Sequence, residues 1–379
     1  MNELTSANTL TVCCRPADGF RTVSNYGRMA QLQWKRQANP KMFSHTVPRK
    51  LLEQFAYDDP RTKSKRLWQY QKGLPPRWKA SPGRATAWNG HFSDPALAAK
   101  EEQIELRLKQ EFEDPVNEFI EMIGYRTFLL DSRRIYLLSG YVRMLFNRSV
   151  ARQSASAIHA VVKMEAFRAL LKDDERLAAL AARYTLDMTQ RGHRLGRMVT
   201  KQEIIEATEK AIALHSGPDE AQRDYIHALE TMMNFPDETM LNGSWGIMTT
   251  DSAHPFVIGD APVVTFERTE RNTLNWGQGF ARPNVEVVLP VSPTVCLHIL
   301  PRVERTREPR QPAPAEVNKG QAAFATKYCF GNIKSPQIDA MLQPEFGNMQ
   351  MGVTGFNTRH IDHNKALFNI LMGRHPKAP

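Results

Sequence analysis

FSHTVPRKLLEQFA, residues 43–56, is the stretch around which this chain of 379 residues is organised. It contains the imidazole of His45, turns at Pro48 and continues into a segment with the apolar spacing of a helix. The segment RLWQYQK, residues 66–72, follows and has the composition of a strand. A short strand is unstable alone in water and needs partners from elsewhere in the chain. We therefore predict that residues 66–72 join a sheet that contains residues 256–300.

The rest of the chain is a helical section followed by strands. Apolar residues recur at helical spacing through about 94–235, and β-branched segments then recur between Trp245 and Leu300. Helices and strands that are segregated along the chain are typical of an α+β fold. We predict a mixed or antiparallel sheet, built from the N-terminal strand and the C-terminal strands, in a single domain over residues 41–379. Residues 1–40 lack periodicity and are predicted to form a flexible basic arm.

Positive charge is concentrated in the first quarter of the chain. Residues 1–100 hold 17 Lys and Arg against 6 Asp and Glu, whereas the remainder holds 33 against 34. This concentration favours a polyanionic partner such as nucleic acid, although a basic segment can also serve solubility alone. The predicted contacts to the polyanion include Arg49, Lys50 and Arg84.

Tryptophans at positions 68, 78 and 88 are interleaved with these basic residues. Aromatic rings among cations suit the stacking of nucleobases beside phosphate contacts. The alternative is that the three rings are half-buried parts of the core, so the sequence leaves both interpretations open.

Several classes of protein are excluded by what the sequence lacks. No apolar run reaches the roughly 18 residues of a membrane span, and no apolar signal core opens the chain. The four cysteines form no C-x-x-C pair, which favours a reducing compartment and argues against a zinc knuckle. There is no phosphate-binding loop, no H-E-x-x-H and no G-x-S-x-G, so no nucleotide cofactor is implied. We expect a cytoplasmic protein without a membrane partner; the sequence identifies no protein partner.

Further motifs accompany the opening stretch: IE at 104–105, an arginine at 148, IGDAPVV at 258–264, PVSP at 290–293 and EVN at 316–318. Together they resemble the uncharacterised bacterial domain-of-unknown-function 4238 family, with its H-Y-V-P, S-D-N-P and P-L-S-P motifs. The resemblance spans about residues 43–332. Here Gly259 stands in place of the family's serine and Ala261 in place of its asparagine, which removes two hydrogen-bonding side chains beside Asp260.

The resemblance implies a set of site residues: His45, Glu105, Arg148, Asp260, Ser292 and Asn318. A histidine and carboxylates can act as general bases, and we assign these catalytic roles to His45, Glu105 and Asp260. His45 and Asp260 are also the candidate ligands of a divalent metal. Arg148, Ser292 and Asn318 are assigned to binding. The alternative is that His45 and Asp260 only hydrogen-bond the backbone beside their prolines.

Two functions follow as hypotheses. The leading one is an enzyme that acts on nucleic acid, a metal-dependent phosphodiesterase or nuclease of bacterial defence or competition. The alternative is a non-catalytic nucleic-acid-binding or regulatory protein; a third is an interaction protein that uses the Ala/Ser-rich segment 151–160. An enzyme needs its polar groups to converge at one accessible place. We therefore predict that His45 and Asp260 lie within one shell, with Arg148 or Asn318 nearby.

Overall fold

The structure is a computed structural model. It describes residues 44–61, 63–88, 95–125, 127–149, 164, 167–190, 198–215, 220–234, 238–269, 273–277, 279–280, 282–302, 305–306 and 309–348. The predicted arm at 1–40 and the Ala/Ser-rich segment 151–160 lie outside these residues. The chain divides into two compact units, one of residues 1–152 and 228–350 and the other of residues 153–227 and 351–379, where the sequence predicted a single domain.

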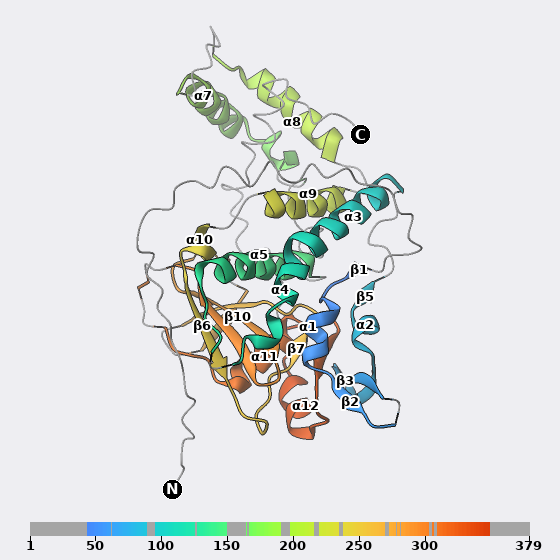
Figure 1. The fold of residues 1–379 in the computed structure, drawn as a ribbon. Coiled ribbons are helices and arrows are strands. Elements are labelled where there is room, and N and C mark those ends of the chain that lie inside the picture. Colours follow the sequence, from blue (N-terminus) through green and yellow to red (C-terminus); the bar gives the residue numbers. More distant parts are fainter. Residues whose placement is uncertain are drawn as a thin grey trace. The chain divides into compact units, whose positions relative to one another are not determined.

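The first sheet of the larger unit has five antiparallel strands. Their order is β6 (Ser244–Thr249), β11 (Val295–Leu300), β10 (Val285–Ser292), β8 (Val264–Arg268) and β9 (Leu274–Trp276). Strand β10 is buried along almost its whole length, because both faces of the sheet are covered. Helix α11 (Pro314–Phe324) packs closely on one face (Figure 1), where a Cβ added to Gly320 would lie 2.7 Å from Trp276.

A second sheet contains the N-terminal strands. Its members are β2 (Tyr57–Asp59), β3 (Ser64–Gln71), β4 (Leu74–Ala80), β12 (Tyr328–Gly331) and β7 (Ile258–Gly259). Strand β3 pairs with β12, and β12 pairs with β7, so the strand predicted at 66–72 does join distant C-terminal strands. The prediction that it shares one sheet with all of residues 256–300 is wrong. After β7 the chain leaves for the first sheet, where its pairing resumes at Val264.

Strand β4 forms where Pro75 and Pro76 favour turns in the sequence. Among the residues that the structure describes, its partner is β3, at the edge of the sheet, and the register shifts between them. Proline is tolerated on an edge strand because its missing N–H faces no partner there. A short pair, β1 (Ser44–His45) with β5 (Ala87–Trp88), lies outside both sheets.

The remaining elements of the larger unit are mostly helical. They are α1 (Arg49–Gln54), α2 (Pro82–Ala85), α3 (Pro95–Leu108), the π-helical turn η2 (Lys109–Glu113), α4 (Asp114–Asn117), the 3₁₀ turn η3 (Ile120–Met122), α5 (Ser132–Arg148), α10 (Glu238–Leu241) and α12 (Pro336–Leu342). Helix α9 (Glu220–Asn234) completes the helical section. The predicted α+β fold is confirmed, and every strand pair among the described residues is antiparallel.

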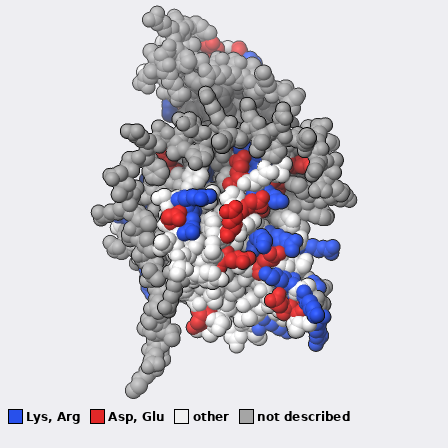
Figure 2. Space-filling view, in the orientation of Figure 1, with Lys and Arg blue, Asp and Glu red and all other residues white. Residues whose placement is uncertain are grey.

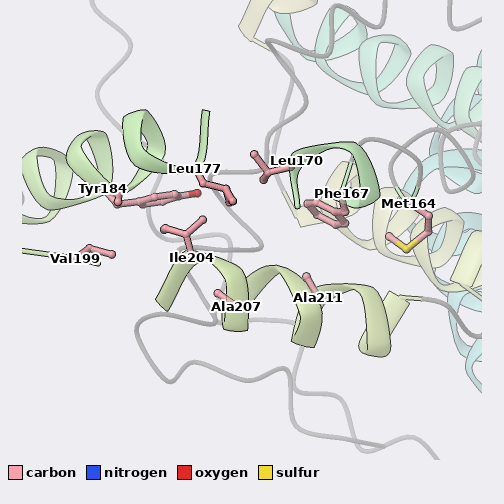
Figure 3. Close-up of a cluster of buried hydrophobic side chains, with 10 residues drawn as sticks. Met164, Phe167, Leu170, Leu177, Tyr184, Val199, Ile204, Ala207 and Ala211 are labelled. Carbon is pink, nitrogen blue, oxygen red and sulfur yellow. The ribbon is translucent and has the colours of Figure 1, made fainter. Parts of the chain in front are cut away.

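The smaller unit is built on α7 (Asp174–Gln190) and α8 (Lys201–His215). Leu177 and Tyr184 of α7 point toward Ile204 and neighbouring alanines of α8 (Figure 3), and this cluster is buried. The unit therefore has a core of its own, which explains why it separates from the rest of the chain. None of the helices that the structure describes is long and apolar enough to cross a membrane.

Candidate functional site

Asp260 lies at the end of β7 and binds the backbone that links α11 to β12. Its carboxylate accepts hydrogen bonds from the N–H groups of Thr326 at 2.7 Å, Lys327 at 2.8 Å and Tyr328 at 3.0 Å. The residue is only 7% exposed. Burial raises the pKa of Asp260 to about 6, against the three N–H groups, which favour the charged form. Both carboxylate oxygens are therefore engaged in joining two segments that lie more than 60 positions apart.

Two amides of α11 hold the segment that leads to Asp260. Asn318 accepts from the N–H of Val257 at 2.8 Å and donates to the carbonyl of Pro255 at 2.9 Å. Gln321 does the same one turn later, to the N–H of Gly259 and the carbonyl of Pro262, both at 2.8 Å. All four contacts are buried. Both amides thus supply hydrogen-bond partners to backbone groups of a segment in which β12 pairs with Ile258 and Gly259.

The PVSP motif borders the same segment. The Ser292 hydroxyl accepts from the N–H of Thr294 at 3.3 Å and so shapes the turn between β10 and β11. Inside that turn, the carbonyl of Pro293 accepts from the N–H of Phe256 at 2.7 Å. These contacts therefore all hold residues 255–260, or the residues that follow them, in place. This segment connects the two sheets and packs against α11.

Gly259 is explained by the closeness of α11. A Cβ added at this position would lie 2.8 Å from the backbone oxygen of Gln321, a distance that real Cβ atoms essentially never show. The family's serine at this position would require α11 to stand farther away. Glycine at position 259, where the family has serine, therefore lets the backbone of α11 pack close to this segment.

We expect Gly259→Ser to lower the free energy of unfolding by about 1–2 kcal/mol, because the added atoms overpack a buried helix contact. Urea unfolding measures this change. The matched control is Gly279→Ser, since an added Cβ there meets nothing within 4 Å. Equal stability of the two variants would contradict this explanation of Gly259.

His45 lies on the short strand β1. Its Nε2 is 3.1 Å from the carbonyl oxygen of Gly83, which can only accept, so Nε2 carries the proton. Nδ1 is then the nitrogen that could ligate a metal, and histidines that ligate metals commonly have such a backbone partner. The neighbouring backbone is fixed by Thr86, whose hydroxyl donates to the carbonyl of Val47 at 3.0 Å.

Glu105 and Arg148 do meet, as a buried ion pair. The Arg148 guanidinium is 4% exposed and donates to the carboxylate of Glu105 through Nη2 and to that of Glu113, at 2.5 Å, through Nη1. The two glutamates are eight positions apart, which in an uninterrupted α-helix places them about 80° apart around the axis. The turn between them is the π-helical η2, whose wider turn reduces that offset. The local π-helix thus lets both carboxylates reach one arginine.

A buried phenol, that of Tyr141, interacts electrostatically with Glu113 and Arg148. Tyr141 of α5 is fully buried, and its hydroxyl has no hydrogen-bond partner among the residues that the structure describes. Burial raises the pKa of Tyr141 well above its ordinary value, and the charge of Glu113 raises it further. Tyr141 is therefore a neutral phenol at physiological pH.

A second buried charge cluster was not predicted from the sequence. Glu286 of β10 is 2% exposed, with His298 Nε2 at 2.7 Å, Arg305 Nη2 at 3.7 Å and Arg268 Nε at 3.8 Å from its carboxylate oxygens. Such a site combines one anion with two guanidiniums and an imidazole, so the buried carboxylate is compensated. The signal in the sequence was a single glutamate in the otherwise apolar run 285–291.

The three predicted polyanion contacts are all exposed, and two of them lie on α1. Arg49 and Lys50 share one acidic neighbour, Glu53, at 2.6 and 3.7 Å. Arg84 lies on α2, and a Cβ added to Gly83 beside it would touch the Arg49 side chain. Figure 2 shows lysines and arginines gathered near α1 and the β2–β3 hairpin, with acidic side chains among them.

The predicted site residues therefore fall into separate hydrogen-bonded groups. Asp260 and Asn318 share one segment with the Ser292 turn, Glu105 pairs with Arg148, and His45 binds the α2 backbone. The part of the chain that the structure describes contains no group of three or more His, Cys, Asp or Glu side chains that could hold a metal. The closeness of His45 to Asp260, and the metal-ligand role of both, stay predictions.

Comparison with known proteins places the chain in a family. No curated protein and no solved structure matches the chain significantly. A family model described as "Protein of unknown function (DUF4238)" matches residues 44–335. The histidine, aspartate, PVSP and asparagine motifs all lie within that range, which covers more than half of the chain. The chain therefore belongs to the DUF4238 family.

Proposed function

We propose that the protein binds nucleic acid through the basic surface of residues 44–88. The observation that carries this proposal is an excess of exposed cations over anions. The described residues of this stretch include ten Lys and Arg against three Asp and Glu. Eight of the basic side chains are exposed: Arg49, Lys50, Arg61, Lys63, Lys65, Lys72, Arg77 and Arg84.

The tip of the β2–β3 hairpin carries the densest part of this surface. We call Arg61, Lys63 and Lys65 the basic hairpin; all three are exposed, and within the described residues none forms an ion pair. Of the nearby carboxylates, Asp59 is buried and accepts a hydrogen bond from the N–H of Arg61 at 3.0 Å. Cations gathered on one projecting hairpin suit the phosphates of a nucleic acid.

The contacts at the predicted catalytic residues favour binding over hydrolysis. Asp260 is saturated by backbone N–H groups and Glu105 is paired with a buried arginine, so both have a structural use that needs no substrate. Nuclease activity stays a prediction. Of the predicted catalytic residues, His45 is the one whose Nδ1 is oriented for a ligand by a backbone hydrogen bond of its Nε2.

We expect the wild-type protein to bind a short DNA or RNA at low salt, with an affinity that falls steeply as salt increases. Reversing the basic hairpin with Arg61→Glu, Lys63→Glu and Lys65→Glu should weaken binding at least about 10-fold. It should also reduce the salt slope by about 0.7–0.9 for each phosphate that the variant no longer neutralises. Fluorescence anisotropy at several salt concentrations measures both quantities.

The control carries the same change in net charge at another place. Lys109, Arg168 and Lys210 are also exposed, and their triple change to glutamate should alter binding less than about threefold. Absence of binding at low salt, or an equal reduction of affinity in the two triple variants, would contradict the proposal.

A further inference from the structure

We infer that Tyr57 and Trp68 form a stacking site for unpaired nucleobases, which makes single-stranded nucleic acid the ligand of the basic hairpin. This inference rests on the proposed function and narrows it to one class of nucleic acid.

The two rings are already arranged as a stack. Their planes differ by 19° and their centroids lie 6.3 Å apart, and both side chains are partly exposed. Tyr57 is directly opposite Arg66 across the β2–β3 ladder, and Trp68 is two residues farther along β3. Residues two apart on a strand share a face, so Tyr57, Arg66 and Trp68 lie on the same face of the sheet. The basic hairpin closes the same β2–β3 ladder, so cations and rings occur on one supersecondary unit.

Trp68 is held in place from its inner side. It packs against the buried cluster that contains Tyr70 together with Ile338 and Leu342 of α12. In that cluster, the Tyr70 hydroxyl donates to the carbonyl of Ile333 at 2.7 Å. A partly exposed ring that is anchored from its inner side is pre-organised, so little conformational entropy is lost when a ligand stacks on it.

An exposed cation accompanies the rings. The ammonium of Lys334 lies 5.6 Å from the centre of the Trp68 ring. A base that stacks there can replace the ammonium over the ring, and the long side chain then reaches the phosphate of the same nucleotide. The two rings thus bind the base of a nucleotide, and Lys334 binds its phosphate.

Stacking selects single strands over duplexes. The bases of a duplex are already stacked and paired, whereas an unpaired base has a free π-face, and each base stacked on an aromatic side chain adds about 1–3 kcal/mol. Phosphate contacts at the basic hairpin are open to both forms. The difference in affinity between the single strand and the duplex therefore measures the contribution of Tyr57 and Trp68.

The test compares a 12-nucleotide oligothymidine with a 12-base-pair duplex by fluorescence anisotropy at one low salt concentration. We expect Tyr57→Leu to weaken binding of the single strand about 5- to 100-fold and to change duplex binding less than about twofold. Tyr57→Phe keeps the ring and should bind like the wild type. Oligothymidine should also quench tryptophan fluorescence in the wild type, and Trp68→Phe should abolish most of that quenching, which tests the site even if Tyr57→Leu folds poorly.

The outcomes separate this inference from the proposed function. If the wild type binds both nucleic acids and Tyr57→Leu weakens neither or both equally, the stacking site is overturned while nucleic-acid binding stands. Unchanged quenching in Trp68→Phe would likewise overturn the stacking site. Lack of binding to either nucleic acid would instead remove the proposed function.

Discussion

Replacement of Arg148 by alanine is expected to lower the free energy of unfolding by about 3–5 kcal/mol, the cost typical of breaking a buried ion pair from one side. The guanidinium lies between Glu105 and Glu113, and its removal leaves two mostly buried carboxylates facing each other without this cation. Like charges in such a place repel strongly because little water screens them. Urea unfolding followed by circular dichroism measures the change.

Two controls establish the cause. Arg107→Ala removes an exposed helix-surface pair with Glu111, which should cost less than about 0.5 kcal/mol. The triple variant Glu105→Gln, Glu113→Gln and Arg148→Met removes all three charges and should recover much of the stability, because buried ion clusters are often replaceable by neutral groups. If Arg148→Ala stays within about 1 kcal/mol of the wild type, the ion cluster does not stabilise the fold.

Asp260→Asn is expected to lower the free energy of unfolding by about 1–3 kcal/mol at pH 7. The asparagine keeps one acceptor oxygen, but its NH₂ group replaces the oxygen that receives the N–H groups of Lys327 and Tyr328. The NH₂ donor of asparagine would then face the N–H donors of Lys327 and Tyr328. The matched control is Asp251→Asn, which also receives two backbone N–H groups but is exposed, so its destabilisation should be smaller. Equal destabilisation in both variants would contradict a special role for Asp260.

The destabilisation caused by Asp260→Asn should grow as pH falls from 7 to about 4.5. The pKa of Asp260 is about 6 in the folded protein, against about 3.9 in an unfolded chain. The native state therefore binds this proton first as pH falls, so the contribution of Asp260 to stability increases between about pH 6 and pH 4 and decreases as pH rises through that window. Two pKa units correspond to about 3 kcal/mol. Asparagine does not titrate, and a difference between wild type and variant that is constant over this range would refute the raised pKa.

The motifs of the family have a structural use in this chain. From the sequence, Asp260 was assigned to catalysis, and Asn318 and Ser292 of the PVSP motif were assigned to binding. In the fold they secure one irregular segment, residues 255–262, against α11 and the β10–β11 turn. Stability measurements on Asp260 and binding measurements on the basic hairpin therefore address different properties of the protein.

The sequence by itself determined the elements and the fold class. Helices α7 and α8 lie within the stretch 94–235 where apolar residues recur at helical spacing, and β10 and β11 lie among the β-branched segments between Trp245 and Leu300. The partnership of the N-terminal strand with C-terminal strands was also predicted. Most of these features depend on interactions between residues close together in the chain, which a sequence pattern records.

Only the tertiary structure decided how strands are shared between sheets and what the polar residues do. The division of β7 and β8 between two sheets depends on two short strands, and no local pattern specifies their partners. Whether Asp260 is free or saturated depends on backbone groups 66–68 positions away, and the pairing of Glu105 with Arg148 depends on a contact over 43 positions and a π-helical turn. Residue types in a sequence show which hydrogen bonds a side chain can form, whereas the partners that use them are set by packing between distant segments.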